Sequence, residues 1–564
     1  MFYLIGTLFV LFLLHKVFIR LQLSKAKHPS LRGHAKMSKR IARLLPFYEY
    51  PDAEIFGVDG APKSIQQQRL SAFKKLKNHF QEKSPWSLIK SEEMQGMVSD
   101  VDFTHNYRVP FQFRNYVARE MKIGIMSNAS RGNEVSDLDG NWSHDLSGSY
   151  GVNLYGYDFY KECMDQGIRM TRNLGPVLGP YHPVMIDNVQ RLKKISGMDE
   201  VSFHMSGTEA VMQAVRLAHY HTKRAKTVVF CGAYHGWWDG VQPGIGNPRR
   251  VSDVYTLKED CEDTLRVLRS RKDIACVLVN PLQALNPNAG STSDSMLVAS
   301  DRYAHYDKNR YISWLKKLRE VCNQKDIILI FDEVFLGFRL AKGGAQEYFG
   351  VKADMVTYGK TLGGGLPVGV VCGKHENMKR FRSDAPADIC FARGTFNSHP
   401  YVMGSMNAFL TRLDQPEYSR DFEIVDKEWN QRATYANEML AKANVPLKII
   451  NMSSIWVPLY TRPSRYNWML QYYLRAEGLL LPWIGTGRFI FSHDYSDEDF
   501  HLVVDKIVNA CIAMETDGWW WKSSELSNQL IKKKVGKELF KVLLMGRRKH
   551  QVVNRHQVKT DTPH

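Results

Sequence analysis

A lysine and an acid, about thirty residues apart, each follow an apolar run that is typical of a buried strand. Ile327-Ile-Leu-Ile-Phe ends at Asp332, and Met355-Val-Thr-Tyr-Gly ends at Lys360. A lysine in such a place can hold a carbonyl cofactor as a Schiff base, and the acid can pair with a pyridinium nitrogen. The pair predicts a pyridoxal 5'-phosphate (PLP) site with Lys360 as its catalytic residue.

Each of these two residues also has a simpler explanation. Asp332 could cap a helix, and Lys360 could be an ordinary surface lysine. Glycines favour the chemical explanation, because Gly359 precedes Lys360, and Gly363, Gly364 and Gly365 follow it closely. Glycine lets the backbone approach a ligand. Burial beside a cation-rich site would also lower the pKa of the lysine, as attack on a carbonyl requires.

Two further segments follow predicted strands. Ser206, Gly207 and Thr208 come after the strand expected over Val201–Met205 and open a helix expected over 208–224. Amides and hydroxyls at a helix start can bind a phosphate, although a serine there is also a common helix cap. Tyr234 and His235 follow the next strand, and a tyrosine there could stack on a cofactor ring or simply belong to the core.

Alternating strands and helices from about residue 181 predict an α/β fold with a mostly parallel sheet and helices on both faces. Ligands of such sheets bind at the carboxyl ends of the strands, where Asp332 and Lys360 both fall. A smaller α+β domain is expected over about 401–520. The strands expected in the large sheet after Val201–Met205 are Thr227–Cys231, Ala275–Val279, Ile327–Phe331, Met355–Tyr358 and Val368–Cys372. In the smaller domain a helix is expected over Asp421–Ala443, with strands at Leu447–Ile450, Ile455–Leu459 and Arg488–Ser492, and a hairpin is expected around Asp139-Gly140.

Several motifs in a fixed order carry a family resemblance. They are Ser206-Gly-Thr-Glu-Ala-Val-Met, Ala233-Tyr-His-Gly236, Phe331-Asp-Glu-Val-Phe-Leu-Gly-Phe-Arg, Lys360-Thr-Leu-Gly-Gly-Gly-Leu-Pro-Val-Gly369 and Arg393-Gly-Thr395-Phe. Over roughly residues 130–510 the chain resembles class III PLP-dependent aminotransferases, and most of all their glutamate-1-semialdehyde aminomutase branch. The resemblance implies the PLP-dependent transferase fold of type I.

The resemblance also implies a role for each matching residue. Lys360 binds PLP and moves the proton between the substrate carbon and the cofactor, and Asp332 pairs with the pyridine nitrogen. Thr395 reaches the phosphate from a neighbouring subunit, which implies a homodimer with composite sites. The other cofactor-binding residues implied are Ser206, Gly207 and Thr208 at the phosphate, Tyr234 over the ring with His235 beside it, Val334 under the ring, and Gln283 near the ring hydroxyl.

One departure from the family pattern bears on the reaction. The family usually has a Glu-Pro pair after the strand that ends at Val279, but this chain has Asn280-Pro-Leu-Gln283. A glutamine near the cofactor's ring hydroxyl is usual in transaminases, and the aminomutases tend to lack it. The sequence therefore predicts a transaminase moving an amino group from a small-molecule amine donor to an aldehyde or ketone acceptor. The alternatives are an intramolecular 2,1-aminomutase and a membrane-associated binding protein with a vestigial fold.

Charge is concentrated at both ends of the 564-residue chain. The net charge is +18, of which residues 1–50 and 522–564 carry +8 each. Basic ends can bind an anionic membrane or nucleic acid, but no motif supports nucleic-acid binding, so none is expected. The eight cysteines form no CxxC pair. A reducing compartment is therefore expected, with neither a disulfide framework nor a metal site.

The first residues form an apolar run, FYLIGTLFVLFLL at 2–14, followed by basic residues that begin with Lys16 and Arg20. Extended to Ile19, this run is marginally long enough to span a bilayer. A signal peptide or a helix docked on the body are the alternatives, but no cleavage site follows. The positive charges after the run predict an uncleaved anchor over 1–23 with the body on the cytoplasmic side.

At the other end, Leu530–Met545 has Ile531, Val535, Leu539 and Val542 on one helical face and lysines on much of the remainder. That pattern is typical of a helix at a membrane interface or of a surface helix packed on the body. Trp519-Trp-Trp521 just before it could be an interfacial aromatic belt or part of the core.

The predicted organisation has six parts: an anchor (1–23), a basic helical region (24–130), the first part of a small domain (131–180), the large PLP-binding domain (181–400), the rest of the small domain (401–520) and a basic amphipathic tail (521–564). No chemistry is assigned to residues 24–100, and the role of the region 24–130 stays open. Arg488 could bind a donor carboxylate or be a surface arginine. The apolar and basic ends suggest a lipophilic acceptor in a specialised biosynthetic pathway.

Overall fold

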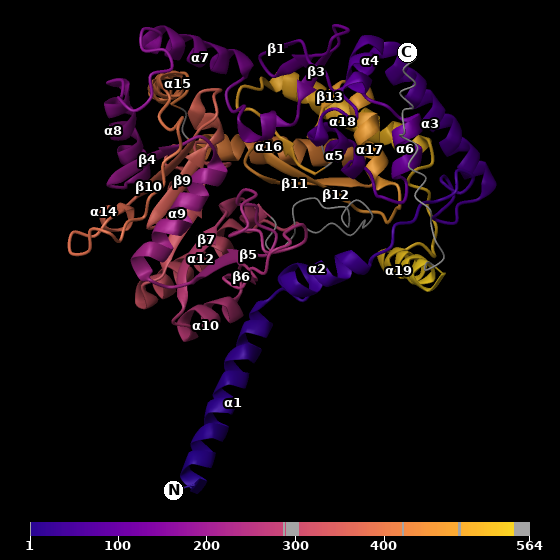
Figure 1. Cartoon of the computed structure of the whole chain (residues 1–564). Helices are drawn as coiled ribbons and strands as arrows, with labels where there is room; N and C mark the ends of the chain where they lie inside the picture. The colour runs from indigo at the N-terminus through magenta and orange to yellow at the C-terminus, as the bar shows by residue number, and fades with distance from the viewer. Residues whose placement is uncertain (1, 286–287, 289–303, 420–421, 483–486, 546–564) are drawn as a thin grey trace, which may run out of the picture.

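The computed structural model describes the whole chain except residues 1, 286–287, 289–303, 420–421, 483–486 and 546–564 (Figure 1). A seven-stranded sheet is its largest element, with the order β4-β10-β9-β8-β7-β5-β6. β10 runs antiparallel to β4 and β9, and the other pairs are parallel. The strands span β4 Glu200–His204, β5 Lys226–Phe230, β6 Val254–Leu257, β7 Ile274–Val279, β8 Ile328–Asp332, β9 Met355–Gly359 and β10 Gly369–Gly373.

Apolar residues of the central strands alternate between two cores, one on each face of this sheet. Leu329 and Phe331 face the larger core, while Ile328 and Ile330 face the smaller one. A strand covered on both faces has to be apolar throughout, as the six buried residues of β7 are. The prediction of a mostly parallel sheet with helices on both faces is confirmed, although β6 was not predicted.

Helices cover both faces of the sheet. α9 (Gly207–Thr222) lies in front of it in Figure 1 and packs in the smaller core, and the larger core includes residues of α8, α10, α12 and α15. The helices of this part span α7 Tyr157–Thr171, α8 Val184–Ser196, α10 Glu262–Ser270, α12 Lys308–Lys325, α13 Gly344–Phe349, α14 His375–Met378 and α15 Pro400–Arg412.

Two smaller sheets complete the body. The first has the order β1-β2-β3-β13, so that Leu479 pairs with His144 across most of the chain length. In this sheet β2 and β3 form the hairpin that was expected around Asp139-Gly140. The second sheet has the order β11-β12-β14. The strands span β1 Ala129–Arg131, β2 Glu134–Ser136, β3 Trp142–Asp145, β11 Leu447–Met452, β12 Ile455–Tyr460, β13 Leu479–Leu480 and β14 Phe489–Ile490. β14 is shorter than the strand expected over Arg488–Ser492.

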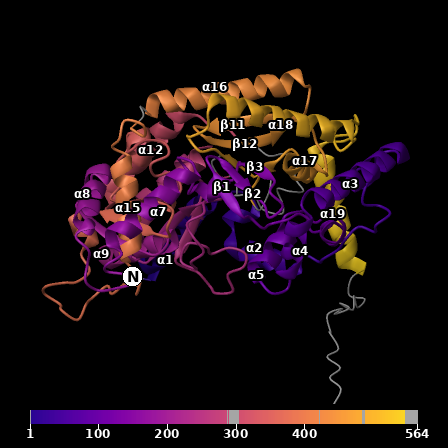
Figure 2. The same cartoon turned by 90° about the horizontal axis from the view of Figure 1, so that it is seen from above.

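The helices of the N-terminal region share a third core with the C-terminal helices. Phe73 and Leu76 of α3 lie in it with Trp429 of α16. A buried ion pair between Arg69 and Asp59 (2.8 Å) adds to this contact, because Arg69 Nε also donates to the carbonyl of Gly518. The helices span α3 Lys63–Lys83, α4 Pro85–Glu93, α5 Ser99–Tyr107, α6 Arg114–Glu120, α16 Phe422–Lys442, α17 Leu470–Ala476 and α18 Asp497–Thr516. Figure 2 shows α16 and α18 side by side along one edge of the molecule.

The tryptophans before the C-terminal helix belong to this core. Trp519 and Trp520 are each 1% exposed, and their indole N–H groups donate to Tyr473 Oη and to Asn467 Oδ1. The interpretation as an interfacial aromatic belt is wrong for these two, because both rings are enclosed by the body and both ring donors are satisfied there.

The two ends of the chain differ in how they meet the body. α1 (Phe2–Ala26) projects away from it, and only its last residues pack, with Ala26 fully buried and its carbonyl accepting from Lys258 N (Figure 1). By length and composition its residues Tyr3–Ala26 could cross a membrane. α19 (Asn528–Met545) instead packs on the body through Ile531 and Glu538. The polar tail from Gly546 lies outside the described residues.

Candidate active site

Lys360 and Asp332 lie at the carboxyl ends of two paired parallel strands. Asp332 pairs with Thr357 in the register of β8 and β9. Lys360 lies just beyond that pair, immediately after the last residue of β9. Lys360 has a left-handed backbone (φ 49°) between β9 and a 3-10 turn, Lys360–Gly363. Its Nζ lies 5.9 Å from the centre of the Phe335 ring. The predicted placement of both residues at this edge of the sheet is confirmed.

Burial governs the electrostatics of Lys360. Loss of solvation lowers the pKa of its amine below the ordinary value, and the nearby carboxylate of Asp332 opposes that shift without cancelling it. A larger fraction of the amine is therefore neutral at a given pH than for a surface lysine. A neutral amine is the form that can attack a carbonyl.

Asp332 is held by three hydrogen bonds. Its Oδ2 contacts His235 Nδ1 at 2.8 Å, and its Oδ1 accepts from Val334 N at 3.2 Å and from Thr357 Oγ1 at 3.3 Å. The carboxyl is 4% exposed. These contacts fix its orientation toward the segment that carries Tyr234 and His235.

Tyr234 and His235 follow β5 and have different environments. His235 is 3% exposed, whereas Tyr234 is 54% exposed. Burial, with the negative charge of Asp332 as a lesser cause, raises the pKa of the Tyr234 hydroxyl. The carbonyl of Tyr234 accepts from Asn280 Nδ2 at 3.0 Å, which ties this segment to the end of β7.

The start of α9 forms another wall. Ser206 Oγ caps the helix by accepting from Glu209 N, which leaves the earlier amides of Gly207 and Thr208 without an intrahelical acceptor. Close approach requires glycine here. A Cβ on Gly207 would lie 2.6 Å from Val334 Cγ1, and one on Gly236 would lie 2.4 Å from Thr208 Oγ1.

Two predicted residues lie elsewhere on this chain. Thr395 is exposed, in the segment before α15, and Arg488 is partly buried immediately before β14.

A strained loop beside Lys360 was not predicted. Ser149 and Tyr150, in the 3-10 turn Gly148–Gly151, both have a positive φ. A Cβ on Gly151 would lie 2.7 Å from Phe335 Cε2 and 3.3 Å from Lys360 Cδ, so this loop borders the lysine directly. The sequence Gly-Ser-Tyr-Gly, which follows the predicted hairpin, is the signal from which this loop could have been predicted.

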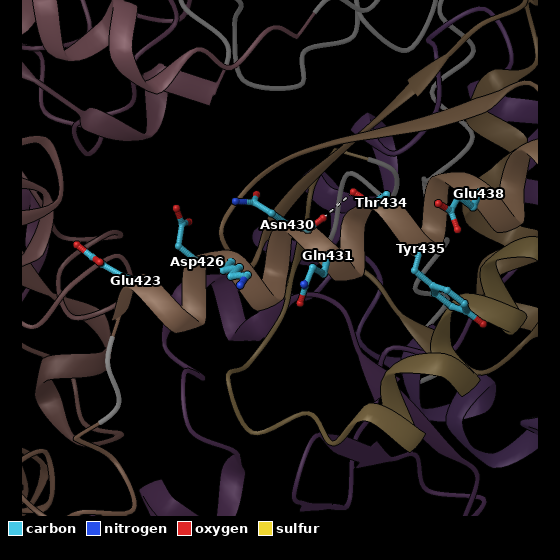
Figure 3. Close-up of a pocket in the computed structure, with 8 residues that line it drawn as sticks. Glu423, Asp426, Asn430, Gln431, Thr434, Tyr435 and Glu438 are labelled. Atoms are coloured by element: carbon cyan, nitrogen blue, oxygen red, sulfur yellow. Dashed lines mark hydrogen bonds between the residues drawn. The ribbon is translucent and has the colours of Figure 1, made fainter.

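The shallow hollow along α16 is a different feature. Figure 3 shows its lining residues, from Glu423 to Glu438, on one helix and pointing away from it. The dashed bond from Thr434 Oγ1 to the carbonyl of Asn430 is an ordinary bond within the helix. Nothing there resembles the convergent groups around Lys360.

Comparisons with known proteins bear on this site. The model of the family "Aminotransferase class-III" matches residues 116–241 and 308–510. The chain belongs to the class III aminotransferases. It is thus a PLP-dependent transaminase by family, and the expected fold, enzyme class and cofactor are confirmed.

Curated relatives of this aminotransferase include glutamate-1-semialdehyde 2,1-aminomutases. That of Methanocaldococcus jannaschii is 33% identical over 406 residues, covering 66% of this chain and 87% of the relative. That of Methanococcus maripaludis (strain C7) is 33% identical, covering 57% and 72%. The predicted likeness to this branch of the family is therefore confirmed.

Solved structures agree on the fold. A transaminase with PLP bound is 25% identical, with a TM-score of 0.58, and the match covers 70% of this aminotransferase and 92% of that chain. A β-phenylalanine aminotransferase from Variovorax paradoxus has a TM-score of 0.62 at 22% identity, covering 79% and 96%. The latter likeness concerns the fold alone.

The described residues fit PLP. His235 Nε2 and Gln283 Oε1 are buried polar atoms without a hydrogen-bond partner among the described residues. Such atoms are costly unless a ligand or water satisfies them. Glycine at positions 207 and 236 lets Val334 and Thr208 pack closely at the start of α9, and the first amides of a helix favour a phosphate.

Proposed function

We propose that this enzyme moves an amino group from a small-molecule amine donor to an aldehyde or ketone, with Lys360 as the group that carries the proton. The supporting observation is the buried amine of Lys360, with its lowered pKa, beside the fixed carboxylate of Asp332. PLP, when bound, supplies the carbonyl and the electron-withdrawing ring that this chemistry needs. The amine of Lys360 takes and returns the proton at the substrate carbon.

The other residues would bind and orient the cofactor. Asp332 pairs with the ring nitrogen, and its bond to His235 keeps the carboxylate in place. Val334 would pack on one face of the ring and Tyr234 on the other. Ser206, Gly207 and Thr208 would hold the phosphate, because the first amides of a helix favour an anion.

Gln283 favours transfer between two molecules. Its buried Oε1, which has no hydrogen-bond partner among the described residues, suits the position near the ring hydroxyl, which is the feature of ordinary transaminases. The curated relatives that are named as aminomutases favour the second candidate, an intramolecular 2,1-aminomutase. Arg488 stays a proposed carboxylate contact, supported by its place before β14.

One experiment separates these functions. Full-length enzyme is supplied with PLP and a carbonyl acceptor, with and without an amine donor, and both product and the visible absorption band are recorded. We expect a band in the wild type and in Lys360→Ala no band and no product, because the amine that binds the cofactor is gone. The exposed Lys352 gives the matched control, Lys352→Ala.

Product that forms only with a donor supports amino transfer, whereas product without a donor supports the aminomutase. A colourless wild type that forms no product would overturn both and favour a binding protein with a vestigial fold.

We also infer a location and an assembly. α1 would anchor the enzyme in a membrane with the body on the cytoplasmic side. Its exposed apolar surface supports this, as do α2 (Ala35–Leu44) and α19 on the side from which α1 projects (Figure 1). Exposed Leu44 and Phe540 lie on these two helices among basic residues. The exposure of Thr395 supports a homodimer in which that residue completes the partner's site.

A further inference from the structure

α2 and α19 are basic helices on the side of the molecule from which α1 projects (Figure 1). α2 has four basic residues and no acid. α19 has five lysines and a single acid, Glu538, which pairs with Arg465 at 2.8 Å. The lysines of α19 and the basic residues of α2 are therefore not offset by an acid of their own helices, and this side of the molecule is positively charged.

Apolar side chains are exposed among these charges. Leu44 lies one turn after Arg40 on α2 and is exposed. Phe540 is exposed on α19 and lies on the opposite face from Ile531, which packs on the body. Exposed basic and apolar side chains on one helix are typical of a membrane interface. We call the exposed face of the two helices the basic apolar surface, and its residues include Arg40, Arg43, Leu44, Lys537, Phe540 and Lys541.

Hydrogen bonds hold both helices to the body and to each other. Lys39 Nζ of α2 donates to the carbonyl of Arg249 at 2.8 Å. In the segment after α2, the hydroxyls of Tyr48 and Tyr50 donate to Glu538 Oε2 of α19 at 2.8 and 2.7 Å. The basic apolar surface therefore has one fixed arrangement on the body, as a docking surface requires.

α1 brings this surface close to a bilayer. Residues 27–34 are all that separates α1 from α2. Because the hydrocarbon core of a bilayer takes about 20 residues of a helix, few of the 25 residues of α1 are left to hold α2 away from the headgroups. The charges that α2 meets there depend on the lipid, and an anionic lipid complements them.

We propose that the basic apolar surface docks the body on the headgroups of an anionic lipid membrane. The arginines and lysines bind the acidic headgroups, and the apolar side chains enter the boundary between headgroups and acyl chains. This contact goes beyond the proposed anchor, because it fixes the orientation of the body, which a single helix leaves free. Through Lys39 and Arg249 it is joined to the segment that begins at Tyr234 and His235 of the active site.

The first test places an environment-sensitive fluorophore on Leu544→Cys in the full-length holoenzyme. Cys261 is replaced by serine, because the other seven cysteines are buried. The protein is reconstituted with vesicles of phosphatidylcholine, alone or mixed with phosphatidylserine. We expect a blue shift of the emission only with phosphatidylserine, and its loss at high salt, which screens the charges. The same fluorophore on Ile186→Cys, exposed on α8, is the control and does not shift.

The second test removes two charges from α19 at once. With the fluorophore on residue 544, Lys537→Gln combined with Lys541→Gln lowers the ratio of docked to undocked protein about tenfold or more, because each lysine is attracted to the anionic leaflet. Lys193→Gln combined with Lys194→Gln is the matched control. These exposed lysines lie on α8, on the other side of the molecule from α19 (Figures 1 and 2), and their loss keeps the shift.

The third test makes the corresponding change in α2. Arg40→Gln combined with Arg43→Gln also lowers the docked fraction that the fluorophore on α19 reports. The reason is that both helices are fixed to one body, so charge lost from one weakens the docking of the other. A charge-dependent shift that responds to α19 alone would make α19 a local contact and overturn the joint surface.

Equal emission with the two lipid compositions, or an unchanged shift in both paired variants, overturns the proposal. A soluble oligonucleotide that shifts the emission on phosphatidylcholine vesicles, where phosphatidylserine does not, would make nucleic acid the partner and also overturn it. Protein that stays off phosphatidylcholine vesicles but docks on those with phosphatidylserine supports this surface and overturns the anchor through α1.

Discussion

Burial shifts the pKa of several groups, among them Lys360, the proposed catalytic lysine. The same cause acts on Glu259, which is fully enclosed between β6 and α10 and whose pKa is raised to about 8. Its Oε1 accepts from Tyr311 at 2.6 Å, while Oε2 has no partner among the described residues. The folded protein therefore favours the protonated carboxyl.

A group with a raised pKa stabilises the fold below its unfolded pKa, and that stability is lost as the pH rises through the folded pKa. From Glu259 we expect a loss on the order of a few kcal/mol between about pH 4.5 and 8. Glu259→Gln removes the ionisation, so its melting temperature falls less over that window. Glu262→Gln, an exposed carboxylate paired with Lys317, is the control. An equally steep fall in Glu259→Gln would contradict this assignment.

Sequence patterns predicted the strand-end residues well, because a buried strand is apolar and its end is marked by the first charge. Lys360 and Asp332 are of this kind. Arg108 could not be predicted as a buried cation, since the contacts that enclose it come from α17, far along the chain. The loop at Ser149 and Tyr150 likewise depends on backbone angles that residue types do not disclose.

At the scale of elements, α1 carries a strong sequence signal but packs on the body only near its C-terminal end. Its apolar surface from Tyr3 to Phe18 is exposed, so nothing in the body stabilises it in water. Burial of that surface in lipid would stabilise it instead.

We therefore expect full-length protein to float with lipid vesicles in a density gradient and protein lacking residues 1–23 to stay at the bottom. A matched control keeps α1 but replaces Lys16 by Gln, which leaves the apolar length intact and should still float. Flotation of the shortened protein to the same extent would show that α1 is not the anchor.

The C-terminal helix shows how periodicity leaves two alternatives open. Its apolar face was compatible with lipid or with the body, and the structure places Ile531 against the body at 1% exposure. Lysines on the other face are exposed in both cases. The burial of Ile531 and the partners of Glu538, which come from distant segments, distinguish the two alternatives. The predicted domain boundaries stay a prediction.

At the scale of the whole molecule, composite sites can be tested by mixing variants. Lys360→Ala and Thr395→Ala are co-expressed with different tags, and their mixed dimers are assayed at limiting PLP. If Thr395 serves the partner's site, mixed dimers hold one intact site, and random pairing restores about a quarter of wild-type activity.

Lys360→Ala mixed with Asp332→Asn is the control. Both residues belong to one subunit's site, because β8 and β9 are paired within the chain. That mixture should recover nothing. Equal recovery in the two mixtures, or none in either, would rule out the shared arrangement.

The carboxylate of Glu538 joins the two ends of the chain's body. It accepts from Tyr48 and Tyr50 and pairs with Arg465 at 2.8 Å, across separations of up to 490 residues. During synthesis, at roughly 5–20 residues per second, the N-terminal region must wait on the order of half a minute or more for this partner. If α1 anchors the protein as proposed, the nascent chain would be tethered to the membrane before its N-terminal region is complete.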